Sequence, residues 1–128
     1  MPTKLLPQHL ADLRASGLSD AQIAACGFYS EADPKAVRRL LRWNGGAHSL
    51  GPGWVAPFLG RDGRPTGYCQ FKPDRPRVGR NGKPRKYENP KGKAIRVFVP
   101  PGTRAALADP AAALLLTEGT KKGAKADQ

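Results

Sequence analysis

Apolar residues between positions 7 and 43 recur at spacings of three and four, which predicts three short helices in this part of the chain. The first helix covers about 7–16, where Leu10 and Leu13 fall on one face. Gly17 is placed to end this helix, because glycine readily adopts the left-handed conformation that terminates many helices.

Polar residues mark the starts of the second and third helices. Ser19, with Gln22 three residues later, forms a capping-box pattern. Asp33 is suited to open the third helix, since its carboxylate can cap backbone amides and the proline after it fits the first helical position. Val37 and Leu41 share the apolar face of this helix. Its basic residues lie on the other face: Lys35, Arg38, Arg39 and Arg42. We interpret that face as solvent-exposed, with contact to phosphates as the alternative.

The middle of the chain has the pattern of a small antiparallel sheet. Residues 53–59 and 66–72 are predicted to be strands, joined by a hairpin turn at 61–64. Pro57 indicates an edge position or a bulge, because proline lacks the amide that a ladder needs. Residues 94–99 are predicted to form a third strand.

The C-terminal part has the pattern of one strand followed by one helix. The continuous apolar run at 112–116 predicts a buried strand, after one or two helical turns at 103–109, and a helix begins near Lys121. Glu118 follows the strand directly. A carboxylate at the carboxyl end of a buried strand lies where open α/β sheets bind ligands, and it can hold a magnesium ion or act as a general base.

These elements predict an α+β fold. Residues 1–43 form a three-helix module, and a Gly-rich linker covers 44–53. A small β-rich subdomain covers 54–110 and carries a long basic loop at 73–93. Residues 111–128 form an incomplete βα unit.

Charge changes the picture, because it is concentrated in one stretch. The 128 residues have a formal net charge of +12. Residues 60–104 hold thirteen basic and three acidic side chains, a balance of +10, whereas 1–59 balance at +2 and 105–128 at zero. A positive field concentrated in this way attracts a polyanion through the release of its counterions.

The basic loop has the composition of a nucleic-acid contact. Arginine and lysine alternate with turn-forming residues, and Tyr87 offers a ring on which a base can stack. A mobile, solvated loop without a ligand is the alternative. The predicted contacts to single-stranded template are Lys72, Arg75, Arg77, Arg80, Lys83, Arg85, Lys86, Tyr87, Lys91, Lys93 and Arg96.

The remaining reactive residues predict no metal or nucleophile site. Cys26, Cys69, His9 and His48 lie on separate predicted elements without the spacing of zinc ligands, so we expect no zinc. Two unpaired thiols, and the lack of a signal-peptide pattern or a long apolar run, favour a cytoplasmic protein without membrane contact.

Five short motifs occur in an order that resembles the N-terminal part of Toprim-type, bacterial-like DNA primases. In these primases a helical "RG-L-S-D-E-T-I…F-G" segment is followed by an apolar strand, a "D-x-x-G-R-x-x-G" turn, a "K-Y-x-N-P" motif and a strand ending in "E-G". The similar segments here are 16–28, 55–58, 61–67, 86–90 and 115–119. The chain is even more similar to Toprim-associated proteins of plasmids, phages and integrated elements, in which Pro100-Pro101-Gly102 and "T-E-G-x-K-K-A" are typical.

The resemblance implies roles for individual residues. Glu118 matches the catalytic Toprim glutamate, which works with magnesium in nucleotidyl transfer, and Lys86 matches a lysine near the primase active site. Lys121 and Lys122 match the paired lysines of the plasmid group. The second Toprim motif, Asp-x-Asp, does not occur in these residues, since Asp127 is too close to Glu118. Magnesium would therefore need a site completed elsewhere.

We therefore expect the nucleic-acid-binding part of a primase-like replication protein of a mobile element, which binds single-stranded DNA or RNA without a complete catalytic site. A helicase or the rest of a Toprim domain is the implied protein partner. One alternative is a stand-alone phage or plasmid protein that captures RNA or a host nucleic-acid enzyme. Another is an active enzyme whose missing carboxylates come from a partner or a second copy.

Overall fold

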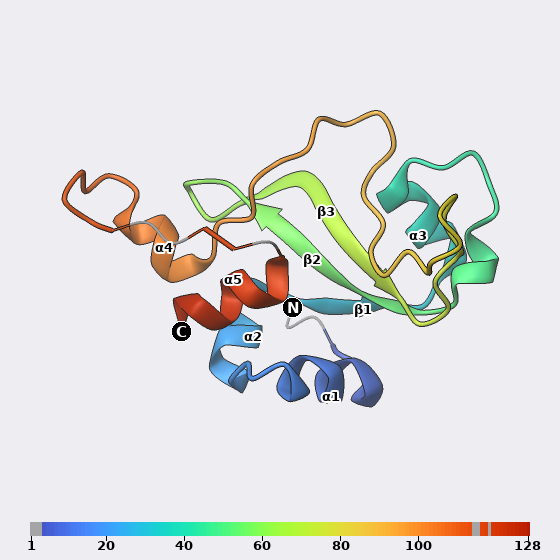
Figure 1. Cartoon of the computed structure of the whole chain (residues 1–128), viewed down its shortest axis with the longest axis horizontal. Helices are drawn as coiled ribbons and strands as arrows, with labels where there is room; N and C mark the ends of the chain where they lie inside the picture. Colours follow the sequence, from blue (N-terminus) through green and yellow to red (C-terminus); the bar gives the residue numbers. More distant parts are fainter. Residues whose placement is uncertain (1–3, 114–115, 118) are drawn as a thin grey trace.

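The computed structural model describes residues 4–113, 116–117 and 119–128, which form helices around a small antiparallel sheet (Figure 1). The sheet has the order β1-β2-β3, with β1 at Tyr29–Glu31, β2 at Gly53–Leu59 and β3 at Pro65–Pro73. The predicted α+β class is confirmed, as are the hairpin strands and their turn. Strand β1 was not predicted, because three residues are too few to show a period.

Three helices from the two ends of the chain cover one face of the sheet (Figure 1). They are α1 at Pro7–Ala15, α2 at Asp20–Cys26 and α5 at Thr120–Asp127. Trp54 and Ala56 of β2 point to this side, because successive side chains of a strand alternate between faces. The core here consists of Leu13, Leu18, Ile23, Cys26, Phe28, Trp54, Ala56 and Ala124.

The other face of the sheet packs against α3 at Pro34–Leu41 and the short 3-10 helix η1 at Ala47–Leu50. Val55 of β2 and Phe71 of β3 point to this side, and both are fully buried. The core here consists of Val37, Leu41, Ala47, Leu50, Val55, Cys69 and Phe71. The sheet therefore lies between two helical layers, and each layer has its own core.

The predicted helix caps are present, but the second helix uses only half of its capping box. The Ser19 hydroxyl accepts a hydrogen bond from the Gln22 amide (3.1 Å), and Asp33 caps α3 in the same way. The Gln22 side chain does not return to Ser19. It donates to the Ala124 carbonyl of α5 (2.8 Å), while the Ser19 amide donates to Gln128 (2.9 Å). Tertiary contact with α5 therefore replaces the local bond.

Pro57 lies in the central strand, next to a register irregularity. Strand β1 pairs only with residues 53–55 of β2, so β2 has a single neighbour at Pro57. The missing amide of proline therefore removes no bond to β1. The register of the β2–β3 pair shifts between Pro57 and Leu59, next to the proline that predicted an edge position or a bulge.

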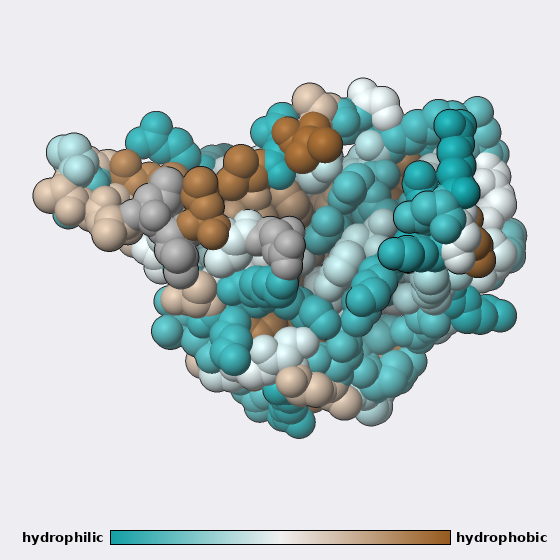
Figure 2. Space-filling model, in the orientation of Figure 1, coloured by the Kyte–Doolittle hydropathy of each residue, from teal (hydrophilic) through white to brown (hydrophobic). Residues whose placement is uncertain are grey.

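The predicted third strand at 94–99 is wrong. These residues have no strand assignment, and their backbone amides make no backbone hydrogen bond within the part of the chain that the structure describes. Phe98 packs against Phe28 and Phe58, whereas Ile95 and Val97 are 89% and 78% exposed. Figure 2 shows hydrophobic surface in brown along the upper side of the molecule. The packing of the Phe98 ring therefore holds this segment on the sheet in place of backbone pairing.

The predicted buried strand at 112–116 includes 114–115, which lie outside the described residues, as does Glu118. Its described members are not in a strand, and Leu116 is 78% exposed, so their predicted burial is wrong. Such a strand is buried only between parallel neighbours and covering helices, and the described residues contain no parallel pairing. The predicted helix after it is present as α5.

The short helix α4 at Pro101–Ala106 is tied to the end of α5. Asp127 accepts hydrogen bonds from the Gly102 amide (2.9 Å) and from the Thr103 hydroxyl (2.8 Å). Burial alone would raise the pKa of Asp127, but hydrogen bonds from Gln22 and from the start of α4 lower it below its ordinary value. No helix of the described residues is long and apolar enough to cross a membrane.

Candidate nucleic-acid interface

The basic loop returns to the sheet after it leaves β3. The amide of Glu88 donates to the carbonyl of Phe71 (2.8 Å), and the amide of Phe71 donates back (2.9 Å). Further out, Arg85 donates its amide to the Arg77 carbonyl (2.8 Å), and Gly79 pairs with Lys83. Residues 77–85 therefore form an irregular hairpin that carries its basic side chains on a defined backbone.

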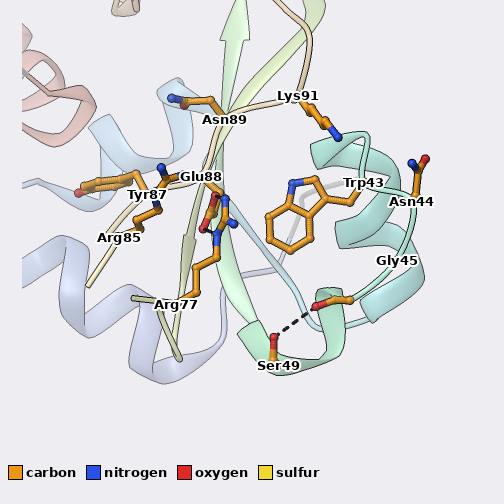
Figure 3. Close-up of a pocket in the computed structure, with 11 residues that line it drawn as sticks. Trp43, Asn44, Gly45, Ser49, Arg77, Arg85, Tyr87, Glu88, Asn89 and Lys91 are labelled. Atoms are coloured by element: carbon orange, nitrogen blue, oxygen red, sulfur yellow. Dashed lines mark hydrogen bonds and ion pairs between the residues drawn. The ribbon is translucent and has the colours of Figure 1, made fainter. Parts of the chain in front are cut away.

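A buried carboxylate holds one arginine of this hairpin in place (Figure 3). Glu88 is only 3% exposed, and it accepts two hydrogen bonds from Arg77, from Nε at 2.7 Å and from Nη2 at 2.9 Å. The guanidinium also lies 4.8 Å from the centre of the Trp43 ring (Figure 3). Hydrogen bonding to Glu88 raises the pKa of Arg77. One edge of the guanidinium is thus fixed by the carboxylate, and the group lies near an indole.

An open hollow of about 720 Å³ lies around the Arg77–Trp43 pair. Arg85 and Lys91 lie on opposite sides of this pair (Figure 3), and neither side chain has a hydrogen bond or ion pair with another described residue. The Trp43 hollow, as we call it, is lined by Trp43, Asn44, Gly45, Gly46, Ser49, Arg77, Arg85, Tyr87, Glu88, Asn89 and Lys91. It combines planar groups, amides and unpaired cations.

The structure brings four of the predicted contacts together in this hollow: Arg77, Arg85, Tyr87 and Lys91. The others are distributed over the hairpin and the segment after it. Tyr87 is half-buried and packs edge-on against Trp54 at 6.0 Å, so part of its ring belongs to the core. The exposed basic residues on the hairpin and beyond are Arg75, Arg80, Lys83, Lys86, Lys93 and Arg96.

Sequence reasoning missed Trp43, Asn44 and Glu88. Trp43 follows the last turn of α3 and precedes an Asn-Gly-Gly turn, where an aromatic ring reaches the surface. Glu88 is one of only two acids among ten bases in residues 72–96. A rare acid in such a basic run is a signal for a local ion pair, and this signal was present in the sequence.

A second hollow of about 450 Å³ extends the basic surface toward α3. The amide of Lys91 donates to the carbonyl of Leu41 (2.9 Å), so residues 91–93 lie beside the end of α3. Lys93 then lines the second hollow together with Arg39 and Arg42. The basic face of α3 is therefore next to the basic loop, as the phosphate-contact alternative requires.

Lys72 has a different environment from the other predicted contacts. Its ammonium donates to Asp12 of α1 (2.7 Å), which also accepts from Trp54 Nε1 (2.9 Å) and from Lys121 of α5 (3.3 Å). Two ammonium groups therefore share one carboxylate, and both are partly buried. This cluster connects α1, β2, β3 and α5.

The pKa values in this cluster shift in opposite directions. Burial would raise the pKa of Asp12, but hydrogen bonds and charges from Lys72, Trp54 and Lys121 lower it. Burial and the charge of Lys72 lower the pKa of Lys121. Burial would also lower the pKa of Lys72, yet its close contact with Asp12 raises it. Lys121 has the longer contact with Asp12, so the repulsion between the two cations lowers its pKa and not that of Lys72.

The predicted magnesium site cannot be assembled from the described residues. No group of three or more His, Cys, Asp or Glu side chains in the described parts of the chain could hold a metal ion. Lys121 contacts the Asp12 carboxylate, whose oxygens already accept three hydrogen bonds. Glu118 lies outside the described residues, so its role stays a prediction.

The cysteines and His9 have structural surroundings. Burial raises the pKa of Cys26 to about 12 and that of Cys69 to about 11, so both thiols stay protonated and unreactive near neutral pH. His9 is buried between Ser30 Oγ at 2.6 Å and Asp74 Oδ1 at 3.0 Å, where it links α1 to β1 and to the end of β3.

No protein-family model matches the chain, and neither the curated proteins nor the solved structures contain a significant match to it.

Proposed function

We propose that this chain binds single-stranded nucleic acid and is the template-binding part of a Toprim primase-like replication protein of a mobile element. The observation that supports the proposal is the Trp43 hollow, which residues 43–49 form together with residues from the stretch that holds the charge excess of +10. Unpaired cations attract the phosphate backbone, and exposed planar groups contact bases that a duplex would hide.

Binding without catalysis is the expected behaviour of these residues alone. The basic surface needs no metal to attract a polyanion. Catalysis would depend on Glu118 and Lys86, the residues that the resemblance to primases implies, and on carboxylates from a partner or a second copy. Magnesium-dependent incorporation of nucleotides that is lost in Glu118→Gln would support an active enzyme.

A second candidate is a protein that captures a host nucleic-acid enzyme or RNA. The exposed side chains of Ile95, Val97 and Leu116 favour it, since large apolar residues at the surface are common in protein interfaces. Under this interpretation the basic surface would attract an acidic partner.

Binding across a salt series separates the two candidates. We expect the chain to bind a labelled single-stranded DNA more tightly than the matched duplex. We also expect log K to fall with log salt at a slope of about −0.7 for each phosphate contacted. Fluorescence anisotropy between low and moderate salt measures both quantities. Negligible binding to both ligands at moderate salt would contradict the proposal and favour a protein partner.

A further inference from the structure

The Arg77 side chain ends in a planar guanidinium whose positive charge is largely compensated. Its guanidinium is paired through two hydrogen bonds with a buried carboxylate, so its positive charge is already compensated. The same side chain is 47% exposed, and its guanidinium carbon lies over the Trp43 ring, 4.8 Å from the ring centre. A guanidinium held in this way is suited to stacking on a planar ligand rather than to holding a phosphate.

The groups around this surface match the parts of a nucleotide. Arg85 and Lys91 line the hollow on two sides of the Arg77–Trp43 pair (Figure 3), and neither side chain has a partner among the described residues. Asn44 and Ser49 also line the hollow, and the Ser49 hydroxyl donates to the Gly46 carbonyl (3.2 Å). The volume of about 720 Å³ lies within the range of small-ligand sites.

From this arrangement we infer that the Trp43 hollow binds one unpaired nucleobase of a single strand, stacked on the Arg77–Trp43 pair, while Arg85 and Lys91 contact the flanking phosphates. This inference rests on the proposed function and makes it more specific. A paired base is not available for such stacking, because its faces are covered by its neighbours in the duplex. The hollow therefore provides the preference for single strands, and the rest of the basic surface provides salt-dependent affinity.

The test compares a thymidine oligonucleotide with an abasic oligonucleotide of the same length and the same number of phosphates. We expect the protein to bind the thymidine strand about tenfold more tightly than the abasic strand, since stacking of one base contributes about 1–3 kcal/mol. Trp43→Leu should abolish this preference, so that the thymidine and abasic strands bind with similar affinity. Trp43→Phe, which keeps a ring, should retain most of the preference.

Fluorescence gives an independent readout. The chain has two tryptophans, and Trp54 is buried. Stacking on the Trp43 platform should quench emission when the thymidine strand binds, and the abasic strand should quench it little. The quench should disappear in Trp43→Phe, whose unchanged unfolding midpoint would show that it is folded.

Glu88→Gln tests whether Glu88 compensates the positive charge of Arg77. The neutral amide frees the guanidinium, so the salt slope should steepen by about 0.7, which corresponds to one more phosphate contact. The preference for thymidine over abasic strands should fall at the same time, because the guanidinium is no longer fixed. An unchanged slope would show that Arg77 already contacts phosphate and would overturn its stacking role.

The outcomes distinguish the inference from the proposed function. If the protein binds both strands and Trp43→Leu keeps the thymidine preference, the base site is excluded and the template-binding proposal stands. If the protein binds neither strand, both fail. A preference that depends on the ring at position 43 supports both.

Discussion

Replacement of Lys83, Arg85, Lys86 and Lys91 by glutamine is expected to lower the affinity for single-stranded DNA about a hundredfold or more at 0.1 M salt. All four side chains are exposed, and no hydrogen bond or ion pair joins them to other described side chains. Each lost phosphate contact reduces the salt slope by about 0.7, so four contacts reduce it by about 2.8. Anisotropy titrations of the fourfold variant and the wild type over the same salt series measure both effects.

Two double variants provide a matched control for net charge. Arg85→Gln with Lys91→Gln removes two cations from the Trp43 hollow, and Arg61→Gln with Arg64→Gln removes two from the turn between β2 and β3. That turn is at the end of the β2–β3 hairpin that lies away from α3 (Figure 1). The first variant should lose far more affinity than the second. Equal losses would show that binding follows net charge and not this surface.

Asp12→Ala is expected to lower the free energy of unfolding by about 2–3 kcal/mol. The Asp12 carboxylate joins α1 to β2, β3 and α5. Its loss leaves two partly buried ammonium groups and the indole N–H of Trp54 without their acceptor. Removing one partner of a fully buried ion pair costs about 3–5 kcal/mol, and the partial exposure of this cluster reduces the loss. Urea denaturation of both proteins at neutral pH measures the difference.

The same variant has an expected pH dependence. The pKa of Asp12 is lowered in the folded protein, so its stabilising effect is complete above the unfolded value of about 3.9. It is lost as the pH falls through the folded pKa. The difference between wild type and Asp12→Ala should therefore stay constant between about pH 5 and 7 and shrink below about pH 4.

Asp20→Asn is the matched control for this prediction. Asp20 also accepts hydrogen bonds from a cation, Arg14 (2.7 and 2.8 Å), but both side chains are mainly exposed. Exposed ion pairs contribute little to stability, so this variant should change it far less. Equal effects of the two substitutions would mean that Asp12 does not hold the four elements together.

The predicted nucleic-acid contacts include lysines with two different environments in the structure. Lys72 and Lys86 looked equivalent in a basic stretch, yet Lys72 is held by Asp12 and Lys86 is exposed. The partner of Lys72 lies 60 residues away in the chain. Such a distant pair has no local signature, so neither composition nor spacing could separate the two lysines.

The sequence alone determined the features that depend on neighbouring residues. Ser19 and Asp33 cap their helices because a short polar side chain reaches amides two or three residues ahead. Gly63 adopts φ of +80° in the hairpin turn, which glycine does without strain. The concentration of charge in residues 60–104 is likewise a property of the sequence.

Only the tertiary structure decided which distant segments meet. The three residues of β1 become a strand because β2 pairs with them, whereas the longer apolar run at 94–99 finds no strand partner among the described residues. Trp43 and Arg77 form one platform because Glu88 returns to β3 and Lys91 to the end of α3. Sequence periodicity shows which face of one segment is apolar. Which other segment packs against that face depends on the surfaces that can be buried together across the whole chain.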